Sequence, residues 1–156
     1  MASFCTNVMA REKIPSAIRE LAAMGFDGLE FWNDFLMSID VAWLAEYLKE
    51  NHIACAQICP YFDFTDDDEK WKQSIKIAER YVELGVQLGK PLIRVFTGKV
   101  GAREATLTQW KRGVGGLKTI CQMGKPLGVR FALETHGGSL METSHSTLQL
   151  LEEVAM

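Results

Sequence analysis

The stretch FALETHGGSL (residues 131–140) ends an apolar run with a carboxylate, an imidazole and two glycines. Side chains alternate along a strand, so Glu134 and His136 lie on one face if the strand extends that far. Gly137 and Gly138 permit positive φ and close backbone approach, which suits a ligand loop and a plain turn equally. The pattern predicts a strand that ends in polar groups just before the chain turns.

Four earlier apolar runs, at 3–9, 26–32, 53–59 and 91–98, precede the fifth at 129–134, and a helical pattern follows each run. The inner stripes of the expected helices are Ile18, Leu21 and Ala22; Val41, Leu44 and Leu48; Trp71, Ile75, Ala78 and Val82; Leu107, Trp110, Val114, Leu117 and Cys121; and Leu148, Leu151 and Val154. No hairpin signal separates the runs. The rhythm predicts five βα units and a parallel sheet.

One helical pattern contains the run GVGG at 113–116. Each glycine inside a helix costs about 1 kcal/mol relative to alanine. A phosphate-binding loop should follow a strand, and this run follows helical residues, which argues against that use.

Strand alternation gives the predicted sheet an apolar face and a polar face. In the third strand, Ala54, Ala56 and Ile58 oppose Cys55, Gln57 and Cys59. The polar face collects Glu30, Gln57, Arg94, Glu134 and, in a longer strand, His136. Helices on both faces would bury these charges at a cost of several kcal/mol each. A TIM (β/α)8-type barrel instead gathers them at its C-terminal mouth, and the first strand lacks the G-x-G-x-x-G turn of a dinucleotide-binding sheet.

Three segments, GFDGLEFW (25–32), IRVFTG (93–98) and especially LETHGGSL (133–140), resemble the xylose isomerase-like TIM barrels. That superfamily includes sugar (phosphate) isomerases and epimerases, the apurinic endonucleases of family 2 and 3-dehydroshikimate dehydratases. The resemblance covers all five strands in order. It implies a divalent metal (Mn, Mg, Co or Zn) held at the barrel mouth by four residues from strands five to eight.

By this resemblance Glu134 matches the first metal ligand and is also a catalytic candidate, while the other three ligands would lie beyond Met156. The dehydratase branch also ends its fifth strand with acid-x-His, which makes His136 a candidate acid/base. The candidate substrate-binding residues are Glu30, Trp32, Gln57, Arg94, Gly137 and Gly138, and Trp32 and Tyr61 could stack on a sugar. Purely structural alternatives are an ion pair of Arg94 with Glu134, a pair of Arg94 with Glu30, and a His136 hydrogen-bonded to its own turn.

A full barrel of this type needs about 250 residues, and this chain has 156, ending LQLLEEVAM inside a helical pattern. We therefore expect a single domain, residues 1–156, that forms five N-terminal βα units of an incomplete barrel. Its open sheet edges could pair with another copy. We expect too few ligands to hold a metal tightly.

The predicted function is a metal-dependent sugar or sugar-phosphate isomerase or epimerase that abstracts a proton next to a carbonyl. Its substrate would be a small carbohydrate or a related polyol or keto compound. One alternative is a 3-dehydroshikimate dehydratase-like lyase. Another is an inactive half-barrel that self-associates.

Composition narrows the remaining classes of protein. The formal charge is −3 with a pI near 5.6, which argues against a basic nucleic-acid surface. No run approaches the roughly 18 apolar residues of a membrane span, and the start lacks a secretory pattern. The four cysteines form no C-x-x-C pair, so we expect a reduced, cytoplasmic protein.

Overall fold

The computed structural model describes residues 2–6 and 11–155. Its elements follow the chain in this order: β1 (Ser3–Cys5), η2 (Arg11–Lys13), α1 (Ile14–Ala23), β2 (Gly28–Trp32), α2 (Asn33–Leu36), α3 (Val41–Glu50), β3 (Ala54–Cys59), α4 (Asp68–Gln87), β4 (Leu92–Val95), α5 (Leu107–Gly124), η3 (Lys125–Leu127), β5 (Arg130–Leu133) and α6 (Ser144–Val154). Each predicted strand and helix is present. The last part of the predicted first strand, residues 7–9, lies outside the described residues.

The five strands form one parallel sheet in the order β1-β2-β3-β4-β5. Strand order therefore follows chain order, as in a barrel, whereas a doubly wound sheet reverses its order at a switch point. In the described part of the chain, no strand pairs with the outer edges of β1 and β5. The sheet is thus an open, incomplete barrel of the predicted class.

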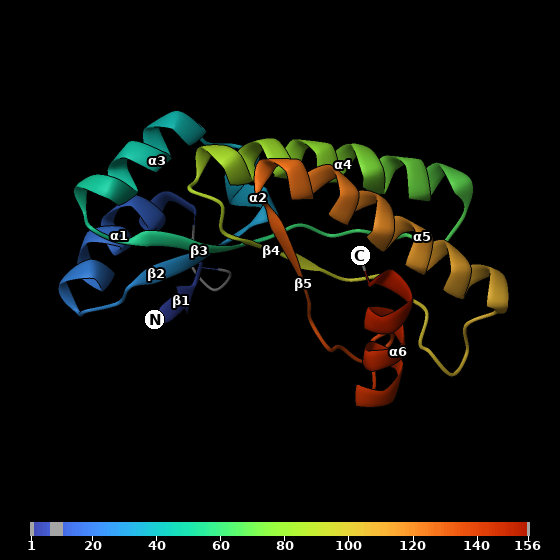
Figure 1. Ribbon diagram of the computed structural model, residues 1–156. Helices are drawn as coiled ribbons and strands as arrows, with labels where there is room; N and C mark the ends of the chain where they lie inside the picture. The colour runs from blue at the N-terminus through green and yellow to red at the C-terminus, as the bar shows by residue number, and fades with distance from the viewer. Residues whose placement is uncertain (1, 7–10, 156) are drawn as a thin grey trace.

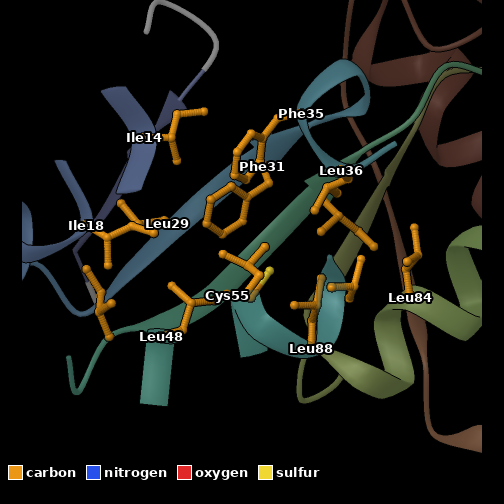
Figure 2. Packing of buried hydrophobic residues seen from close by; sticks show 14 of the residues in the cluster. Ile14, Ile18, Leu29, Phe31, Phe35, Leu36, Leu48, Cys55, Leu84 and Leu88 are labelled. Atoms are coloured by element: carbon orange, nitrogen blue, oxygen red, sulfur yellow. The ribbon is translucent and has the colours of Figure 1, made fainter. Parts of the chain in front are cut away.

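The core lies between the sheet and its covering helices. Leu29 and Phe31 of β2 are fully buried against Ile18 of α1 and Leu44 of α3. Figure 2 shows Ile18, Leu29 and Phe31 in this cluster together with Leu84 of α4. Helices α4 and α5 lie side by side over the later strands (Figure 1). Burying each such side chain contributes about 1.5–3 kcal/mol.

The parity prediction is correct in β4 and wrong in the first half of β3, before the register shift. Ile93 and Val95 are fully buried under the helices, on the face opposite Arg94. Cys55, predicted on the polar face, instead packs in the hydrophobic core (Figure 2). The β2–β3 register is the reason: Leu29 pairs with Cys55 and Glu30 with Gln57, so one extra residue is accommodated between them. Such a bulge inverts the alternation on one side of it.

The glycines of α5 allow the helix to pack closely. A Cβ on Gly116 would lie 2.3 Å from Cγ of the buried Phe64, and one on Gly113 would lie 2.5 Å from Cδ1 of Leu140. Gly115 has nothing within 4 Å of that position. The GVGG run is therefore a packing surface in mid-helix, and two of its three glycines are needed there.

Helix ends follow the sequence closely. Asp67 caps α4 by accepting a hydrogen bond from Lys70 N, and Thr106 and Thr143 form capping boxes on α5 and α6. The short helix α2 was not predicted, and Asn33 ties it to α4 by accepting a hydrogen bond from the Tyr81 hydroxyl at 2.7 Å. Among the described residues, no helix has the length and apolar character needed to cross a membrane. All four cysteines are free thiols.

Candidate active site

An open cleft of about 950 Å³ lies where the carboxyl ends of β2 to β5 meet. Seven residues singled out from the sequence line it: Trp32, Tyr61, Arg94, Glu134, His136, Gly137 and Gly138. They come from β2, β4 and the segments after β3 and β5. The C-terminal mouth is where barrels of this type carry their chemistry.

Arg94 and Glu134 form an ion pair, with Nη1 of the arginine 3.1 Å from Oε2 of the carboxylate. The Arg94 side chain is only 8% exposed, whereas that of Glu134 is 45% exposed. The backbone N–H of Glu134 donates to the carbonyl of Val95 at 3.3 Å, which continues the β4–β5 pairing by one residue. Glu134 is therefore anchored by the strand and the arginine, and its carboxylate stays open to the cleft.

Aromatic rings enclose the Arg94 guanidinium. Its central carbon lies 4.7 Å from the ring centre of Trp32, 5.5 Å from that of Tyr61 and 4.6 Å from that of Phe96. Its Nε and Nη2 atoms are buried without a hydrogen-bond partner in the described structure, an arrangement that costs about 1–3 kcal/mol per group. Cation–π attraction, about 0.5–2 kcal/mol at each well-placed ring, offsets part of that cost. This geometry suits a role for Arg94 in orienting the Glu134 carboxylate.

The contact of His136 with its own turn assigns a tautomer to its ring. Its Nδ1 atom lies 2.8 Å from the carbonyl oxygen of Gly137. Because a carbonyl can only accept, the proton is on Nδ1, and neutral imidazole then keeps a free lone pair on Nε2. The ring also packs edge-on against Phe96 at 5.1 Å, which limits its rotation. His136 thus bonds to its own turn through Nδ1, as the structural alternative has it, and keeps Nε2 free as a basic nitrogen.

Glu30 and Gln57, two further sequence candidates, do not line the cleft. Gln57 Nε2 donates to Glu30 Oε2 at 3.5 Å, and the Ser3 hydroxyl donates to Glu30 Oε1 at 3.2 Å. Glu30 therefore pairs with Gln57, not with Arg94. Cys59 lies close to Gln57 and Arg94. Burial raises the pKa of its thiol to about 11, although the positive charge of Arg94 acts to lower it.

Several cleft residues were not predicted as site residues: Asp63, Lys70, Phe96 and Lys99. Asp63 shapes the segment after β3, since its Oδ1 accepts hydrogen bonds from Thr65 N, Thr65 Oγ1 and Asp66 N. Lys70 lies on an exposed face of α4, and Lys99 lies in the β4–α5 loop. Charged residues are common at both kinds of position, so the residue type alone does not indicate a function. Phe96 could have been found, because it shares the strand parity of Arg94.

The described residues do not make a metal site by themselves. No cluster of three or more His, Cys, Asp or Glu side chains in residues 2–6 and 11–155 is arranged to hold an ion. Glu134 offers one carboxylate oxygen of the kind that Mg²⁺ and Mn²⁺ prefer. The resemblance to the family implies four ligands, of which Glu134 would be one.

Comparison with known proteins agrees with this geometry. A family described as "Xylose isomerase-like TIM barrel" matches residues 18–155. A 3-dehydroshikimate dehydratase from Bacillus anthracis is 26% identical over 139 residues, covering 83% of this chain and 48% of the relative. The chain thus spans about half the length of that curated relative.

Solved structures show the same fold. The probable 3-DHS dehydratase AsbF of Bacillus anthracis superposes with a TM-score of 0.84 at 23% identity, covering 99% of this chain and 59% of AsbF. An L-ribulose 3-epimerase gives 0.82 at 20% identity, with 100% and 58% covered. An IOLI protein with a bound zinc atom gives 0.78 at 20% identity, with 99% and 59% covered. The chain belongs to the xylose isomerase-like TIM barrel family.

Proposed function

We propose that this chain supplies the N-terminal part of an active site that abstracts a proton next to a carbonyl of a small polyhydroxylated substrate. The observation that carries the proposal is the pairing, in one cleft, of an anchored and open Glu134 with a His136 whose Nε2 is free. A carboxylate and a basic imidazole at a barrel mouth are suited to general acid–base chemistry. Trp32, Gly137 and Gly138 are proposed substrate contacts.

His136 is the proposed acid/base. Its Nε2 lone pair accepts the proton from the carbon next to the carbonyl, and the resulting N–H can return it. Returning the proton to carbon gives isomerisation or epimerisation, whereas transferring it to a leaving hydroxyl releases water. Arg94 orients Glu134, which we propose as one ligand of a divalent metal that would polarise the substrate oxygens when bound.

Dehydration is the reaction to test first. The 26%-identical relative is a 3-dehydroshikimate dehydratase, and the Glu134-x-His136 pattern supports the same branch. Loss of water from a dehydroshikimate ring leaves an aromatic dihydroxybenzoate, which absorbs in the ultraviolet. Sugar isomerisation or epimerisation, the prediction from the sequence, is the second candidate, and L-ribulose 3-epimerase is among the proteins of the same fold.

The test is a product assay on the protein that contains this chain, with Mn²⁺ added. 3-Dehydroshikimate is followed by ultraviolet absorbance, and ketose epimers are separated by chromatography. We expect turnover of one class, and His136→Gln should lower kcat by about 100-fold or more, as loss of a general base does. Turnover of neither class, or full activity of His136→Gln, would refute the proposal.

A further inference from the structure

Two loops form much of the cleft wall. The loop between β4 and α5 carries Phe96 and Lys99, and the loop between β5 and α6 carries His136 and Gly138. Their relative position therefore sets the shape of the cleft. One contact between them is the fully buried Thr97 hydroxyl, which accepts a hydrogen bond from Leu140 N at 3.1 Å.

Glu142 makes a second connection, with both carboxylate oxygens. Oε1 accepts a hydrogen bond from the backbone N–H of Arg103 at 3.3 Å, and Oε2 accepts one from the backbone N–H of Gly138 at 3.4 Å. Its own N–H donates to the carbonyl of Ser139 at 3.1 Å, which closes the turn around the side chain. A single half-buried carboxylate thus bridges the β4–α5 and β5–α6 loops.

Two glycines adjoin the Glu142 carboxylate: Gly101 leaves room for it, and Gly138 donates a hydrogen bond to it. A Cβ on Gly101 would lie 2.7 Å from Glu142 Oε2, so a residue with a side chain there would displace the carboxylate. Gly138 has φ of +74°, a conformation that glycine adopts at little cost. In that conformation the N–H of Gly138 points toward Glu142. One residue further along, the Ser139 hydroxyl donates to the carbonyl of His136 at 2.7 Å.

We propose that Glu142 is a positioning residue for the candidate site. By holding the Gly138 amide against the Arg103 amide, it fixes the turn that carries His136 relative to the loop that carries Phe96. The imidazole packs against Phe96 in this arrangement, with the ring centres 5.1 Å apart, and we expect this contact to loosen when the bridge is removed. The role in catalysis rests on the function proposed above, but the bridge itself does not.

Backbone amide exchange measured by NMR tests the bridge directly. In Glu142→Ala, exchange at Arg103 and Gly138 should accelerate by about 10-fold, the loss expected for a hydrogen bond to a charged group, while Leu140 and the amides of α4 keep their rates. In Glu142→Gln only one side-chain oxygen remains as an acceptor, so one of the two amides should stay protected. Glu152→Ala, which removes an exposed carboxylate from α6, should change neither amide.

A second readout concerns His136. The Hε1 resonance of its ring should shift in Glu142→Ala and stay in place in Glu152→Ala, because only the first change releases the ring from Phe96. Unchanged exchange at both amides, or equal acceleration throughout α4, would overturn the proposal, as would an unmoved His136 resonance. Failure of the enzyme assay with normal exchange effects would instead count against the proposed function alone.

Discussion

Gly116 offers a sharp test of the packing between α5 and the cleft. Replacing it by alanine places a methyl group 2.3 Å from Cγ and 2.9 Å from Cβ of Phe64. Phe64 is fully buried and stacks against Phe62 at 5.6 Å, so the ring has little room to retreat. The neighbouring Gly115 has nothing within 4 Å and provides a matched control in the same helix turn.

The expected free energies follow from two opposing effects. Alanine stabilises a helix interior by about 1 kcal/mol relative to glycine, and Gly115→Ala should gain that amount. Gly116→Ala gains the same but suffers overpacking near the upper end of the usual range, about 3 kcal/mol, and so should lose about 2 kcal/mol. Gly113→Ala would place its methyl group 2.5 Å from Cδ1 of Leu140, the end of a flexible side chain, and should fall between the two.

Thermal and urea unfolding of the three variants measure this order. A chain of this size shifts its Tm by roughly 3 °C per kcal/mol, so Gly115→Ala and Gly116→Ala should differ by about 9 °C. If Gly116→Ala were as stable as Gly115→Ala, the close approach of α5 to Phe64 would be wrong. The cleft segment after β3, which contains Phe64, would then be placed incorrectly as well.

Three further predictions concern the cleft and its surroundings. Arg94→Met should change the free energy of unfolding by less than about 1.5 kcal/mol in urea titrations. The variant loses the ion pair with Glu134 and the ring contacts, but it also removes the buried Nε and Nη2 groups, which have no hydrogen-bond partner in the described structure. A loss above about 3 kcal/mol would show that the Arg94–Glu134 ion pair dominates local stability. Burial raises the pKa of the Cys59 thiol from its usual 9.0 to about 11. At pH 8 this thiol should therefore react with a disulfide reagent about 100-fold more slowly than a free thiol, and its reaction should accelerate as the pH rises toward 11. Rapid labelling at pH 8 would contradict the burial of Cys59. Calorimetry of this chain with Mn²⁺ should show no saturable micromolar binding, since Glu134 has no cluster of further ligands among the described residues, and micromolar affinity for a monomer would disprove this.

Strand parity predicted which side chains of the sheet face the helices, because it depends only on alternation. Ile93 and Val95 had to face one way and Arg94 the other, and the structure follows that pattern. The same rule misplaced Cys55, because an extra residue in β3 has no signature in an unbroken apolar run. Alternation is reliable where pairing is regular and fails at a bulge.

The candidate site was less accessible from the sequence. Glu134 and His136 stand out because polar groups rarely end an apolar strand. Asp63 and Lys99 lie in loops, where polar residues are expected anyway, so their type carries no signal. The Arg94–Glu134 ion pair, which the sequence offered as a structural alternative, is present. That Glu30 would pair with Gln57 depends on the shifted β2–β3 register, which alternation does not define.

The IRVFTG segment shows how packing alone can fix a motif. Gly98 has φ of +140°, and a Cβ there would lie 2.2 Å from Oγ1 of Thr65, so any other residue would displace the side chains that the β3–α4 segment packs against it. Immediately before it, the Thr97 carbonyl accepts a hydrogen bond from Phe64 N at 2.8 Å, and the Thr97 hydroxyl accepts one from Leu140 N. Threonine and glycine thus join the loops after β3, β4 and β5. Because these contacts hold the loops that carry the proposed acid/base and its neighbours, substitutions at Gly98 should impair the cleft through its geometry.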